Sequence, residues 1–214
     1  MRLFRCFAVV ALLGTVANPA IGREPAIPAK MPHGYLKAAA LPDSAEWAPA
    51  PPVAGTPALL RDKAGAEAGV ALRGSPRWDV AVRDADLTGD GALGAFDCTL
   101  GIRVGPKTTP KTYALLRRTM MDFGGSTGLI KKKYMRPRPF MENGQPSCTP
   151  EWEERLRQDG SYPSGHSAIG FGTALVLAEM DPDRASSIMS RGRAFGDSRR
   201  VCNVHWLSDI EEGR

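Results

Sequence analysis

The sequence lacks a second long apolar run, has few histidines and cysteines, and shows little of the alternation that is typical of β-strands. Only residues 7–16 form a sustained apolar stretch, which is too short to cross a bilayer. No stable membrane insertion is therefore expected. No CxxC spacing or other convincing cluster of metal ligands is present, so we expect neither a metal nor another cofactor. The scarcity of β-type alternation favours an all-α fold built as a helical bundle.

The first 22 residues have the pattern of a signal peptide. Arg2 and Arg5 precede the apolar run, and small residues follow it up to Gly22. We expect cleavage after Gly22 and a periplasmic or secreted mature protein.

The cysteines support one disulfide. Cys6 lies in the predicted leader, which leaves an odd number of cysteines in the mature chain. An exported protein folds in an oxidising compartment where disulfides persist. We expect one disulfide and one free thiol, and the sequence does not choose among Cys98, Cys148 and Cys202.

The mature chain divides into two parts. Residues 23–56 are rich in proline and alanine and are predicted to form an extended arm, whereas residues 57–214 are predicted to form one helical domain. Within that domain, a segment with five prolines at 135–163 is expected to be a long functional loop. The predicted helical segments are 58–72, 78–87, 110–123, 165–179, 183–195 and 201–212, and residues 92–102 supply an apolar segment.

Three short segments combine cations, histidines and turn-forming residues. They read KKKYMRPRP at 131–139, GSYPSGH at 160–166 and SRRVCNVHWLSD at 198–209. Lys131, Arg138 and Arg199 can together surround one anion, because arginine offers a planar fork of donors and lysine a compact charge. Each cation taken alone is more typical of a solvated surface. The net charge of +5 fits an anionic ligand, and nothing indicates nucleic-acid binding as a function.

The two other segments add a helix start and a histidine–aspartate pair. Ser164 is placed to cap a helix, and Gly165 would let a ligand approach the backbone closely. His205 and Asp209 are four residues apart on a predicted helix, so Asp209 can fix the tautomer of His205 and leave the other ring nitrogen free to attack. Considered alone, each feature is equally or better explained by a structural role.

In combination, the segments match the ordered signature of the type 2 phosphatidic acid phosphatase superfamily, K-x6-RP, PSGH and SR-x5-H-x3-D. All eleven specified positions are filled in order. The residues around these motifs most resemble the bacterial class A non-specific acid phosphatases, and the resemblance covers roughly residues 40–214.

This resemblance implies an acid phosphatase that hydrolyses small phosphomonoesters with broad specificity, without a metal, through a phosphohistidine. It implies His205 as the nucleophile, Asp209 as its orienting partner and His166 as the general acid. The implied phosphate-binding residues are Lys131, Arg138, Ser164, Gly165 and Arg199. Homodimers would be unsurprising, although the sequence does not fix the oligomeric state.

Two other functions share these motifs. A vanadium-dependent haloperoxidase uses the same three-part site, and a non-catalytic protein could bind phosphate without turning it over. A membrane lipid phosphatase would need several spans around the motifs. Class A enzymes continue for another helical segment beyond the position of Asp209, so the domain at 57–214 is expected to be truncated at its C-terminus.

Overall fold

The computed structural model describes residues 32–88 and 91–214, and within them the chain forms helices and no strand, which confirms the all-α fold class. The longer helices are α1 (Pro57–Val70), α2 (Pro76–Asp84), α5 (Pro110–Gly125), α9 (Gly165–Met180) and α10 (Ala185–Val201). The shorter ones are α3 (Gly91–Gly94), α4 (Asp97–Leu100), α6 (Gly128–Tyr134), α7 (Pro139–Asn143), α8 (Glu153–Arg157) and α11 (Leu207–Gly213), with 3-10 turns at Ala38–Ala40, Pro150–Trp152 and Pro182–Arg184.

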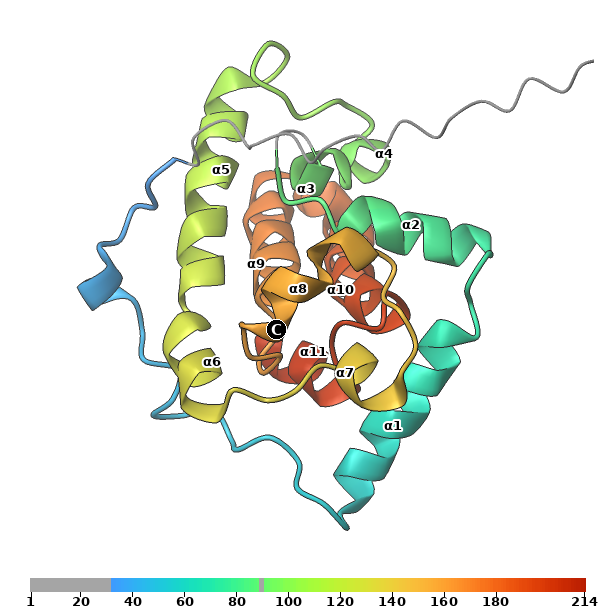
Figure 1. Cartoon of the computed structure of the whole chain (residues 1–214). Helices are drawn as coiled ribbons and strands as arrows, with labels where there is room; N and C mark the ends of the chain where they lie inside the picture. The colour runs from blue at the N-terminus through green and yellow to red at the C-terminus, as the bar shows by residue number, and fades with distance from the viewer. Residues whose placement is uncertain (1–31, 89–90) are drawn as a thin grey trace, which may run out of the picture.

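Helices α9 and α10 lie side by side at the centre of the molecule (Figure 1). Helix α5 packs against α9 on one flank, while α1 and α2 pack against α10 on the other. Glycines allow the central pair to approach closely, since a Cβ at Gly192 would collide with the side chain of Ala174. The main core lies between α9, α10 and α5 and includes the fully buried Leu116, Ile188 and Phe195.

Local sequence signals set several helix starts. Thr56 and Ser75 cap α1 and α2 through their side-chain oxygens, and a proline follows each cap. Helix α5 begins at Pro110, as its sequence predicts, because proline at the first helical position loses no intrahelical hydrogen bond.

Two predicted elements differ from the structure. The expected loop at 135–163 holds two short helices, α7 and α8, and α7 starts at Pro139 because a proline is tolerated at a first helical turn. The apolar segment 92–102 contains α3 and α4. The expected helix 201–212 is wrong in its first half, since α10 continues to Val201 and α11 starts only at Leu207.

The described part of the predicted arm contacts α5 and the segment after it. The carboxylate of Asp122 accepts from the amide of Tyr35 at 2.9 Å, and the hydroxyl of Ser44 donates to the carbonyl of Ser126 at 2.8 Å. The predicted leader at 1–22 lies outside the described residues. None of the helices in the described ranges has the length and apolarity that crossing a membrane requires.

The expected disulfide joins Cys148 to Cys202, and Cys98 is the exposed free thiol. The bond ties the segment between α7 and α8 to the end of α10. It therefore fixes the chain three residues before His205.

Candidate active site

His205 and Asp209 contact each other at the start of α11. His205 lies in the turn before this helix, so the prediction that both residues share one helix is wrong, although their pairing is right. His205 Nδ1 is 3.3 Å from Asp209 Oδ2, and the same oxygen accepts from the amide of Trp206 at 2.9 Å. Asp209 is fully buried because it is the third residue of α11 and faces back over the helix start.

The partner of the second ring nitrogen determines the tautomer of His205. Nε2 is 3.2 Å from Nη1 of Arg138. A guanidinium can only donate, so Nε2 must carry the lone pair and Nδ1 the proton that faces Asp209. Burial, followed by the charges of Arg138, Lys131 and Arg199, holds the pKa of His205 well below its usual value. The neutral imidazole is therefore the favoured form.

The three predicted cations surround this histidine. Lys131 comes from α6, Arg138 from the residue before α7 and Arg199 from α10. Burial and the neighbouring Arg138 lower the pKa of Lys131 to about 8. The same two causes lower the pKa of Arg199 to about 9.

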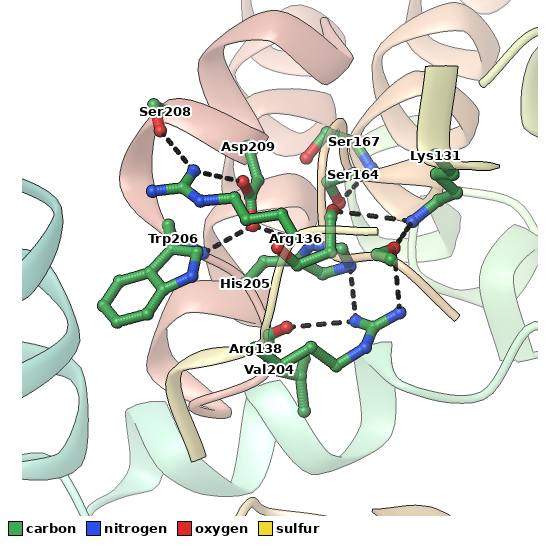
Figure 2. A network of polar contacts seen from close by, with 12 residues as sticks. Lys131, Arg136, Arg138, Ser164, Ser167, Val204, His205, Trp206, Ser208 and Asp209 are labelled. Atoms are coloured by element: carbon green, nitrogen blue, oxygen red, sulfur yellow. Dashed lines mark hydrogen bonds and ion pairs between the residues drawn. The ribbon is translucent and has the colours of Figure 1, made fainter. Parts of the chain in front are cut away.

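Arg138 and Arg199 differ in their partners. The Nε group of Arg138 donates to the carbonyl of Leu156 at 3.0 Å. Its Nη1 group donates to the carbonyl of Val204, also at 3.0 Å (Figure 2). Arg199 is 3% exposed, and its Nε and Nη1 atoms are buried with no hydrogen-bond partner among the residues that the structure describes. Unpaired buried donors of this kind are costly, which favours an anionic ligand at this position.

The start of α9 closes another side of the site. Ser164 caps the helix by accepting from the amide of Ser167 at 3.2 Å, and its own amide donates to the carbonyl of Asp209 at 2.8 Å. The amides of Gly165 and His166, at the first helical positions, have no intrahelical acceptor, and the helix dipole favours negative charge there. Gly213 permits this packing because a Cβ there would collide with the carbonyl of Ser164.

His166 is positioned by α2 and α10. Its Nε2 is 3.1 Å from the carbonyl of Ala85, and its ring stacks on Phe195. A carbonyl only accepts, so Nε2 carries a proton. Burial, followed by the charge of Arg199, lowers the pKa of His166 well below its usual value.

Sequence reasoning missed two residues of the buried network, Arg136 and Asp62. Arg136 donates to Asp209 Oδ1 at 2.6 Å and to Asp62 Oδ2 at 2.7 Å, as the view of its guanidinium beside Asp209 illustrates (Figure 2). Asp62, from α1, also accepts from the amide and hydroxyl of Ser208. Arg136 lies inside the first motif and gave a weak signal, whereas nothing in the sequence distinguishes Asp62 from a solvated acid of α1.

The negative charge of a further buried acid, Asp84, is compensated by side chains of the protein. Asp84 is 3% exposed and accepts from Arg191 and from the hydroxyl of Ser198. Within residues 32–88 and 91–214, no group of three or more histidine, cysteine or acidic side chains could hold a metal ion.

Comparisons with known proteins identify the family. The profile described as the PAP2 superfamily matches residues 113–214, which include all three motifs. The chain belongs to this superfamily of phosphatases, as its helical fold and buried cations also indicate.

Three similar proteins indicate which kind of phosphatase this chain is. A non-specific acid phosphatase of Salmonella typhimurium is 43% identical over 170 residues, which cover 78% of this chain and 68% of the relative. One of Providencia stuartii is 37% identical over 214 residues, which cover 100% of this chain and 86% of the relative. An acid phosphatase of Zymomonas mobilis is 39% identical over 163 residues, 76% of this chain and 62% of the relative. The chain is thus an acid phosphatase, and the resemblance to the class A non-specific enzymes is confirmed.

Proposed function

We propose that this acid phosphatase hydrolyses small phosphomonoesters through a phosphohistidine on His205. The observation that carries the proposal is the geometry of that ring. Nδ1 faces a buried carboxylate, and Nε2 presents its lone pair to Arg138 among buried cations. A neutral imidazole with an oriented lone pair is what an attack on phosphorus requires.

Lys131, Arg138 and Arg199 would neutralise the phosphoryl oxygens, with the first amides of α9 as further donors. Phosphoryl transfer depends mainly on such positioning and charge neutralisation, which three fixed cations can supply without a metal ion. The unpaired donors of Arg199 support this assignment most directly, since a bound phosphate would satisfy them.

The chemical steps follow from these positions. The lone pair of His205 Nε2 forms a bond to phosphorus while the ester P–O bond breaks, and His166 gives a proton to the leaving oxygen. Water then attacks phosphorus, His166 accepts its proton, and the P–N bond breaks to release inorganic phosphate. A bound phosphate dianion would offset the charge of Arg199, which is one of the causes that lower the pKa of His166.

We further propose that the protein acts in the periplasm or is secreted. The Cys148–Cys202 disulfide supports this location, because such bonds persist in oxidising compartments. The predicted signal peptide at 1–22 and a homo-oligomer remain predictions.

The test is a rapid acid-quench and alkaline-quench experiment with p-nitrophenyl phosphate at about pH 5–6 in excess EDTA, a range set by the unperturbed pKa of histidine. Wild-type protein should turn over and leave a phosphoenzyme that is labile in acid and stable in alkali. His205→Ala should lose both, whereas the control His33→Ala changes an exposed histidine and should keep both. A phosphoenzyme that persists in His205→Ala would exclude His205 as the nucleophile, and activity lost with EDTA would exclude a metal-free reaction.

A further inference from the structure

The half-exposed carboxylate of Asp159 forms ion pairs with Arg138 and Lys131, two of the cations that surround His205. Asp159 Oδ2 lies 3.1 Å from Nη2 of Arg138 and 3.6 Å from Nζ of Lys131. The side chain of Asp159 is 53% exposed, whereas those of Arg138 and Lys131 are 2% and 11% exposed. An acid at the rim of the site therefore reaches inward to two buried positive charges.

The donors of Arg138 are all engaged in this structure. Its Nε donates to the carbonyls of Leu156 and Asp159, its Nη1 to Val204 and His205, and its Nη2 to Gly160 and the carboxylate of Asp159. A guanidinium has five N–H donors and no acceptor. A phosphate oxygen can therefore bind Arg138 only where a present partner gives way.

His205 Nε2 leaves Nη1 when it attacks phosphorus in the proposed reaction. Among the remaining partners, the carboxylate of Asp159 is the one best suited to exchange. The carbonyls that hold Arg138 belong to the backbone around α8 and to the turn before α11, so displacing them would move the chain. The carboxylate is on a half-exposed side chain that can rotate into solvent. It also carries the charge and oxygen geometry of the phosphate oxygens it would exchange with.

Lys131, like Arg138, is held by a backbone carbonyl and also pairs with the carboxylate of Asp159. Its Nζ donates to the carbonyl of Gly160 at 2.5 Å, which fixes its position independently of the acid. The carboxylate of Asp159 is the anionic partner of this amine. Both cations thus keep their place through backbone carbonyls, and Asp159 contributes charge rather than orientation.

We propose that Asp159 is a competing internal anion, which substrate displaces on binding and which promotes release of the product phosphate. This inference rests on the proposed role of Lys131 and Arg138 in binding phosphate. Without such a competitor, buried cations would hold inorganic phosphate tightly and slow the enzyme by product inhibition. With it, phosphate must replace a favourable ion pair and then lie beside a negative charge.

The matched test is Asp159→Asn against Asp183→Asn. Both substitutions remove one acid, and Asp183 is an exposed residue of the 3-10 turn at the opposite end of α9 from Ser164. Asparagine keeps the shape and leaves the backbone carbonyls that hold Arg138. The dissociation constant of inorganic phosphate is measured by calorimetry at pH 6 and low salt, and the inhibition constant of phosphate is measured by p-nitrophenyl phosphate turnover.

We expect phosphate to bind Asp159→Asn about three- to tenfold more tightly, because removing a charge about 5 Å away in a water-like dielectric changes affinity about fourfold. The difference should shrink in 0.5 M salt, and Asp183→Asn should match the wild type. Unchanged or weaker phosphate binding by Asp159→Asn would overturn the inference, since a positioning acid has the opposite sign.

A Lys131→Gln variant separates this inference from the proposed function. It should lose phosphate affinity if the buried cations bind phosphate. Lost affinity in Lys131→Gln with no gain in Asp159→Asn would reject the competing anion alone. Unaltered affinity in Lys131→Gln would reject the phosphate-binding role on which both rest.

Discussion

Arg136 joins two fully buried acids, Asp62 of α1 and Asp209 of α11, and its removal gives the sharpest test of how the site is held. Its side chain is 8% exposed, against 1% for Asp62 and 0% for Asp209. Removing one partner from a buried ion pair costs about 3–5 kcal/mol, because the remaining charge stays buried without compensation. Both acids keep other donors here, so we expect Arg136→Gln to lose about 3 kcal/mol of unfolding free energy.

The measurement is thermal and urea unfolding of purified protein beside Arg61→Gln. For a chain of this size, about 3 kcal/mol corresponds to a fall in Tm of about 6–12 °C. Arg61 pairs with Glu211 at 2.9 Å, but both side chains are well exposed, so its loss should cost at most about 1 kcal/mol. If the two variants are equally stable, the buried network does not hold α1 to the site and the reasoning is wrong.

Arg136→Gln should also change the pH dependence of kcat/KM, which the loss of a purely structural residue would not do. Burial raises the pKa of Asp209, and Arg136 is the first of the influences that lower it. Without Arg136 the pKa rises further, so the carboxyl takes up a proton at a higher pH and no longer accepts a charge-assisted bond from His205. The acid limb of kcat/KM should therefore move to higher pH. A uniform loss of activity at every pH would contradict this.

Three further predictions concern stability and pH. Reducing the Cys148–Cys202 bond should cost about 4 kcal/mol, the loop-closure value for a separation of 54 residues, and lower Tm, whereas Cys98→Ser should have little effect on the melting curve. Deprotonation of Lys131 should weaken substrate binding as pH rises through about 8, so kcat/KM should show an alkaline limb near that value that Lys131→Arg moves upward; a limb that stays in place would assign it to another group. Ser164→Ala should destabilise the protein by about 1 kcal/mol in urea unfolding through the lost cap, and an unchanged midpoint would show that the cap contributes nothing.

Much of the fold and the candidate site follows from local sequence signals. Helix starts at residues 57 and 110 are encoded by a proline at the first helical position, a signal that acts within one turn of chain. The site motifs are similarly local, since each is a short segment of defined spacing, and their ordered combination predicts the superfamily without any knowledge of tertiary contacts. The number of cysteines predicted one disulfide and one free thiol.

Other features arise only from contacts between distant segments. Spacing alone placed His205 and Asp209 on one helix, but the chain turns at Asn203, whose φ is +62°, and α11 starts after His205. The pairing of Cys148 with Cys202 depends on how the segment after α7 folds over the end of α10. Neither result can be obtained from residues that are neighbours in sequence.

The sequence by itself determined the family and the helical class, and it selected the candidate site residues, because these depend on residue type and short spacing. Only the tertiary structure placed Asp62 of α1 and Arg136 behind Asp209, and Asp159 on Arg138 and Lys131. Isolated acids and arginines look alike in a sequence, since burial and partners determine their charge, cost and role. Those quantities exist only once the helices have packed together.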